Sequence, residues 1–123
     1  ALAAGTLAVG AIGGKRGVVY TYRDTGGSWE LEGVLVAPSG PSNEKISDMF
    51  GGAVVVSAGV LVVGAKEYNN GKGGAFVYSR DGGAGGAWTL AQKLSSQDAV
   101  EGDSFGVSVG LLDNVIIVGK LGP

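Results

Sequence analysis

Residues 48–65 read DMFGGAVVVSAGVLVVGA, and residues 103–120 repeat this pattern as DSFGVSVGLLDNVIIVGK. In both stretches an Asp lies two residues before a Phe-Gly pair, and two apolar runs follow with a short turn between them. The second apolar run also matches residues 7–11 (LAVGA), so Gly10, Gly64 and Gly119 recur at spacings of 54 and 55 residues. Self-similarity at such a period indicates one supersecondary unit that is repeated along the chain.

Each repeat predicts four short β-strands. The valine-rich runs at 54–56 and 61–63 are apolar on both faces, which is typical of strands buried on both sides. In the last strand of a repeat, Trp29, Leu31 and Leu35 alternate with polar residues, which predicts one buried and one solvated face. The expected strands, from first to fourth position of the repeat, are 51–57 and 106–112; 6–11, 60–65 and 115–119; 18–22 and 75–79; 29–36 and 88–95.

This order, from buried inner strands to a half-exposed outer strand, is typical of a β-propeller blade of four antiparallel strands. No segment shows helical periodicity with caps, so the predicted fold is all-β, with about two and a quarter blades. Residues 1–37 are expected to form strands 2–4 of a partial blade, 50–95 a complete blade, and 105–119 the first two strands of a third. Propellers close with about four to eight blades. We therefore expect a piece of a longer propeller, or a subunit that packs on neighbouring copies.

The composition excludes several classes of protein. The chain is rich in glycine (25 of 123 residues) and apolar residues (45%) and has only 16% charged residues, which argues against disorder. A net charge of −2 argues against nucleic-acid binding. The absence of Cys and His excludes disulfides, a Cys/His zinc site and a Ser-His-Asp triad within the chain. The longest near-apolar run, 52–65, is shorter than the roughly 20 residues of a transmembrane helix, so no membrane span is expected.

With these motifs the chain resembles the FG-GAP repeats of integrin α-chain propellers and of their bacterial and algal relatives. The resemblance rests on the Phe-Gly motifs at 48–51 and 103–106, the VVGA motif at 62–65, the GAFVY run at 74–78 and the segment 88–94. A kelch repeat has a similar period of about 50 residues and would give the same fold. However, kelch repeats have Gly-Gly where residues 64–65 are Gly-Ala, and they lack the Phe-Gly motif.

The resemblance implies a non-catalytic structural or adhesion segment of a larger extracellular or cell-surface protein or assembly. Its expected partners are other propeller blades, of the same or of neighbouring chains, and a protein or glycan surface ligand. Two other interpretations share the fold: the propeller scaffold of a secreted enzyme whose catalytic residues lie outside this chain, and a kelch-like intracellular adaptor.

No cofactor or metal is expected. Integrin-type repeats often have a calcium loop between their first two strands, and calcium takes six to eight oxygen ligands. The corresponding turns here, 58–59 and 113–114, have at most one carboxylate. The segment 9–15 (VGAIGGK) is similar to a phosphate-binding loop, but Val9 and Arg16 occupy the positions of the required Gly and Ser/Thr. A hairpin loop is therefore predicted there.

The two Phe-Gly motifs are expected to have structural roles. Asp48 and Asp103 are placed to accept backbone N–H groups, as in an Asx-turn, rather than to act as general acids. Phe50 and Phe105 each precede a first strand and are expected to be core residues whose truncation costs stability.

Aromatic and charged residues of the outer strands provide the remaining candidates. The two tryptophans, Trp29 and Trp88, are expected to fill the gap between blades rather than to stack on a sugar. No catalytic residue is expected. Arg and Tyr are common in protein interfaces, and four residues at the turns between third and fourth strands are candidate contacts, although a solvated ion pair would explain them equally well. These candidate interaction residues are Tyr22, Arg23, Arg80 and Asp81.

Overall fold

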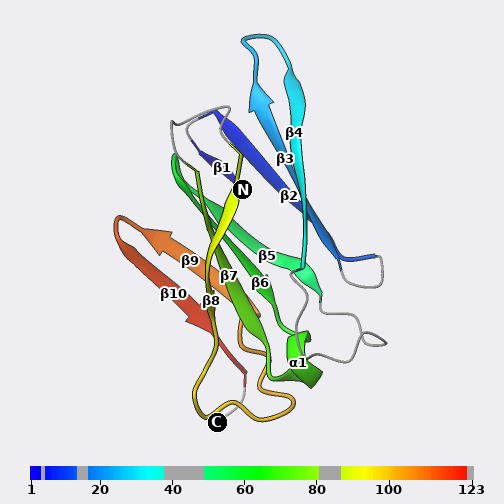
Figure 1. Cartoon of the computed structure of the whole chain (residues 1–123), viewed down its shortest axis with the longest axis vertical. Coiled ribbons are helices and arrows are strands. Elements are labelled where there is room, and N and C mark those ends of the chain that lie inside the picture. The colour runs from blue at the N-terminus through cyan, green and yellow to red at the C-terminus, as the bar shows by residue number, and fades with distance from the viewer. Residues whose placement is uncertain (4, 14–16, 38–48, 81–86, 122–123) are drawn as a thin grey trace.

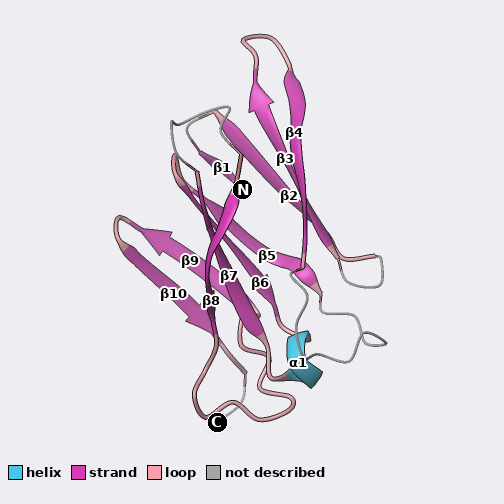
Figure 2. Ribbon diagram, viewed as in Figure 1, coloured by secondary structure: helices cyan, strands magenta, loops and turns pink. Residues whose placement is uncertain are grey.

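The computed structural model describes residues 1–3, 5–13, 17–37, 49–80 and 87–121. They form three antiparallel β-sheets that lie one against the next (Figures 1 and 2), which confirms the all-β propeller-type fold. The first sheet contains β1 (Leu2–Ala3), β2 (Thr6–Ala11), β3 (Val18–Asp24) and β4 (Trp29–Val36). The second contains β5 (Phe50–Val56), β6 (Val60–Ala65), β7 (Gly74–Ser79) and β8 (Thr89–Leu94). The third contains β9 (Ser108–Leu112) and β10 (Val115–Gly119).

Within each sheet, strands that follow one another in sequence are paired antiparallel. All nine predicted strands are present, with ends that differ by at most two residues from the prediction. The additional strand β1 is not predicted because two residues are too short to show an alternating pattern; it pairs with Thr6 and Leu7. The one helix among the described residues, α1 (Tyr68–Gly71), is a single turn in which Asn69 and Asn70 have positive φ. No helix in these ranges is long and apolar enough to cross a membrane.

The second sheet is the middle layer. Its strand β5 contacts β2 of the first sheet and β9 of the third, so both faces of the sheet are covered. This explains why five consecutive residues of β6, from Leu61 to Ala65, are buried. Edge-to-face aromatic contacts of 5.3–6.4 Å between ring centroids connect Tyr68, Phe76, Phe50 and Tyr78 in the core.

Burial of Tyr78 has a consequence at high pH. Desolvation disfavours the phenolate and raises the pKa of Tyr78 from 10.0 to about 12. The unfolded chain therefore loses this proton at a lower pH than the folded chain. We expect stability to be unaffected by this group below pH 10 and to fall as the pH rises from 10 towards 12. Ultraviolet titration should show one late phenolate that is absent from a Tyr78→Phe variant; a Tyr78→Phe titration identical to the parent's, apart from total amplitude, would contradict the assignment.

The outer strand β4 departs from the predicted alternation because it contains a β-bulge. Thr21 pairs with Gly33 and the next residue, Tyr22, pairs with Leu31, so Glu32 is the extra residue. A bulge reverses which side chains face the core. The side chain of Glu32 is accordingly turned inward, whereas Leu31 is 58% exposed, so the prediction that Leu31 is buried is wrong.

The bulge recurs in β8. Val77 pairs with Gln92 and Tyr78 pairs with Leu90, which leaves Ala91 as the extra residue. Ala91 stands 59 residues after Glu32, the same offset that separates the two tryptophans. The bulge is therefore a feature of the repeat, but only the first sheet places an ionisable side chain there.

Candidate functional site

The two Phe-Gly turns have the same backbone geometry. Met49 and Gly51 have φ values of 52° and 96°, and the equivalent Ser104 and Gly106 have 56° and 95°. A backbone hydrogen bond of 3.0 Å spans three residues in each turn. Positive φ after the Phe suits glycine, because it has no Cβ to clash with the backbone. The repeated motif thus encodes one turn that recurs at the start of successive sheets.

Each Phe-Gly turn lies against glycines of the preceding sheet. A Cβ added to Gly10 would overlap the carbonyl oxygen of Gly51, and one added to Gly64 would overlap that of Gly106. The glycines before the third strands, Gly17 and Gly73, approach the Phe carbonyls of the same turns in the same way. The two halves of the repeat motif, Phe-Gly and Gly-Ala, are therefore the two sides of one backbone contact between neighbouring sheets.

Asp103 has a structural position beside the second turn. Its carboxylate is buried, accepts the backbone N–H of Val100 at 3.1 Å and pairs with the Lys120 ammonium at 3.3 Å. It therefore accepts a backbone N–H as predicted, but from the segment before it rather than from the Phe-Gly turn. Asp48 lies outside the described residues.

Arg80 is buried between the first two sheets, and the prediction of an exposed contact residue is wrong for it. The residue is 6% exposed, and its guanidinium donates to the carboxylate of Glu32 at 2.8 Å and to the hydroxyl of Thr6. The guanidinium carbon also lies 4.3 Å from the ring centroid of Trp88, in a cation–π contact. Arg80 follows β7, whereas Thr6 and Glu32 belong to β2 and β4, so this side chain joins one sheet to the next.

The other predicted contact residues do not join Arg80. Tyr22 is half-buried, and Arg23 is exposed and lies 3.8 Å from the carboxylate of Glu30, across β3 and β4. Asp81 lies outside the described residues. Contact of Tyr22 and Arg23 with another molecule stays a prediction.

The two tryptophans differ in their surroundings. Trp88 is 9% exposed and packs at the junction of the first two sheets, as predicted. Trp29 is 42% exposed, so the prediction of a buried position is wrong for it. The repeat places Trp29 where it would meet a sheet before the first one, and the described part of the chain has no sheet there.

Sequence reasoning missed Glu32 and Thr6 as residues of this junction. One signal could have identified Glu32: Gly33 interrupts the strand, and glycine inside a strand often indicates a bulge. Thr6 carries no such signal, because its role depends on a partner 74 residues away.

The buried ion pair is expected to contribute measurably to stability. A Glu32→Gln substitution keeps the shape but removes the charge that Arg80 binds, and should lower the free energy of unfolding by about 1.5–3 kcal/mol. The matched control is Glu30→Gln, since the exposed Arg23–Glu30 pair should contribute only about 0.2–1 kcal/mol. Urea unfolding measures both values, and equal losses would show that the Arg80 contact does not connect the sheets.

Across the described ranges, no group of three or more Asp, Glu, His or Cys side chains is arranged to hold a metal ion. The turn at Asp113 offers one carboxylate in a left-handed residue (φ 51°), far from the six to eight oxygens of a calcium site. We expect calcium to leave the melting temperature of the chain unchanged. Melting curves with calcium and with a chelator provide the measurement, and a stabilisation of several degrees by calcium would contradict the expectation.

Stacked antiparallel meanders joined by equivalent Phe-Gly turns define the class of this protein as a β-propeller repeat protein. A sequence model of the FG-GAP repeat matches residues 88–122, from Trp88 through the first two strands of the following sheet. The chain is therefore an FG-GAP repeat protein, as the motifs predict. No curated protein matches the chain. An FG-GAP repeat indicates a propeller-type protein-interaction module.

Proposed function

We propose that the chain is a non-catalytic structural or adhesion segment of a larger extracellular or cell-surface protein or assembly, in which it makes protein–protein or surface contacts. The observation that supports this most is the exposure of large apolar side chains on both end sheets. Trp29, Leu31 and Val36 on β4 are 42–62% exposed, and Val115 and Ile117 on β10 are 58–63% exposed. Extended exposed apolar surface is typical of sites where other protein surfaces bind.

The environment of the ionisable residues supports a non-catalytic role. Glu32 is paired with Arg80, and Asp103 is paired with Lys120 and a backbone N–H. Carboxylates with such partners are held in their charged form, whereas a general acid needs a raised pKa. The chain also contains no His, the most frequent general base in enzymes, and no Cys that could act as a nucleophile.

The proposed location outside the cell rests on the resemblance to integrin-type propellers. Within this proposal, Tyr22 and Arg23 are the side chains offered to a partner, because they lie together at the exposed end of β3. An exposed Arg beside an aromatic residue can bind a carboxylate and pack on an apolar group at once.

Labelling of intact cells of the source organism with an antibody against the chain tests the location. Staining without permeabilisation is expected; staining only after permeabilisation would favour the intracellular adaptor. A photo-reactive amino acid at Tyr22 or Arg23 tests the contact, with exposed Gln92 on β8 as the matched control position. Cross-links to one defined protein from positions 22 and 23 but not 92 would support the proposed surface, and equal labelling from all three would contradict it.

A further inference from the structure

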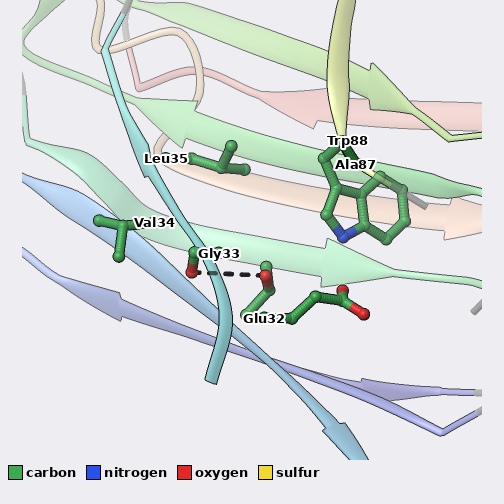
Figure 3. A pocket seen from close by; sticks show the side chains of 7 residues that line it. Glu32, Gly33, Val34, Leu35, Ala87 and Trp88 are labelled. Carbon is green, nitrogen blue, oxygen red and sulfur yellow. Dashed lines mark hydrogen bonds between the residues drawn. The ribbon is translucent and has the colours of Figure 1, made fainter. Parts of the chain in front are cut away.

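A cavity of about 210 Å³ lies between the first sheet and the start of the second. It is lined by Thr21 and residues 32–35 of the first sheet and by Ala87 and Trp88 of the second (Figure 3). Thr21 and Trp88 are buried, whereas Val34 is 49% exposed, so the cavity opens to solvent at β4. Neither the ion pair of Glu32 nor the packing of Trp88 requires an open space at this junction.

Polar atoms without partners face this region. In the described part of the chain, Oε2 of Glu32, Nε of Arg80 and Nε1 of Trp88 are buried and have no hydrogen-bond partner. Glu32 and Trp88 both line the cavity, and both contact the same Arg80 guanidinium. Figure 3 shows the indole nitrogen of Trp88 on the side of the ring that faces Glu32. The cavity thus presents one strong acceptor and one donor that are close together and unused. Buried polar groups are nearly always satisfied, so an occupant with polar atoms is expected.

The chemistry of the walls restricts the occupant. The charges of Glu32 and Arg80 cancel, so the cavity favours neither an anion nor a cation. A hydroxyl group can accept from the Trp88 N–H and donate to the Glu32 carboxylate at the same time. Val34, Leu35 and the indole offer an apolar wall for C–H groups. At about 30 Å³ for each water, the cavity is several times larger than the single water that could bridge the two atoms.

We propose that this inter-sheet cavity is a binding site for a neutral polyhydroxy ring, the size of one pyranose unit of a glycan. Hydroxyl groups of the ring bind Glu32 Oε2 and Trp88 Nε1, and its C–H face packs on Val34 and Leu35. This site lies apart from Tyr22 and Arg23 and does not depend on the proposed adhesion role, because a sugar can bind here whatever protein contacts the chain makes.

The first test uses the unmodified 123-residue chain. Saturation-transfer NMR with methyl glycosides of glucose, galactose, mannose and N-acetylglucosamine should detect binding of at least one, with a dissociation constant on the order of 1 mM. Tetrahydropyran, the same ring without hydroxyl groups, should not bind. Binding of tetrahydropyran as strong as that of the glycosides, or no binding of any glycoside, would overturn the proposal and indicate a cavity that holds water only.

The second test locates the site. A Trp29→Phe substitution, at an exposed position, leaves Trp88 as the only tryptophan, so its fluorescence should change saturably with the bound glycoside. In this background Val34→Phe, which fills the mouth of the cavity, should weaken binding at least tenfold. Leu31→Phe on the same strand, outside the cavity and similarly exposed to solvent, should leave binding unchanged. Equal effects of the two substitutions, or none from Val34→Phe, would show that the sugar binds elsewhere.

Discussion

Replacement of Phe50 by Ala is expected to lower the free energy of unfolding by about 3–5 kcal/mol, the usual cost of removing a fully buried Phe. Phe50 is 0% exposed and has edge-to-face contacts with Phe76 and Tyr78 at 5.6 and 6.4 Å. Its carbonyl also lies against Gly17 of the preceding sheet, so the residue joins the core of the second sheet to the first.

The equivalent Phe105 gives an internal comparison. The repeat predicts the same cost for both residues, but Phe105 is only half-buried because the third sheet has two described strands to cover it. Phe105→Ala should therefore cost about 1–2 kcal/mol, in proportion to the smaller apolar area that it buries. Urea unfolding at matched chain concentration measures both. A Phe50→Ala variant as stable as the parent, or a larger loss at Phe105 than at Phe50, would contradict the assignment of the core.

The fold could be predicted from the sequence because its determinants are local and repeated. Strands such as β6 and β10 are short apolar runs, and their recurrence at 54–55 residues defines the blade without any knowledge of distant contacts. The Phe-Gly and Gly-Ala motifs can be predicted as features of the repeat. Their physical reason, a close backbone approach between Gly51 and Gly10, required the structure.

The junction around Arg80 could not be predicted in the same way. A single extra residue, Glu32, changes the alternation of β4 and turns a carboxylate inward that the pattern places in solvent. Arg80 is then buried by a partner 48 residues away, although its own neighbours in sequence indicate an exposed turn. Bulges and long-range charge pairs of this kind depend on the packing of two sheets, which the local pattern does not record.

The described chain is expected to associate with itself when it is isolated. The free edge of β10 has no paired strand among the described residues, and its sequence Val115–Val118 is entirely apolar. Unpaired apolar edges recruit other strands. On the opposite end, Trp29 and Leu31 of β4 are exposed to solvent, and only 16% of all residues are charged. Two four-stranded sheets and one two-stranded sheet are also fewer than the four blades of the smallest propellers.

A matched pair of variants tests whether these surfaces cause the association. Ile117→Lys places a charge on the open strand β10, at a side chain that is 63% exposed, and should reduce self-association without loss of β-structure. Gln92→Lys on β8 adds the same charge at an exposed polar position and should have no such effect. Equal behaviour of the two variants would show that the open third sheet is not the surface that associates.

Size-exclusion chromatography with light scattering on the isolated 123-residue chain tests the open propeller segment most directly. At micromolar concentration, the structure predicts a mass of two or more chains, or aggregation. A soluble monomer that melts cooperatively would contradict an open stack of blades and would require a closed fold for this chain.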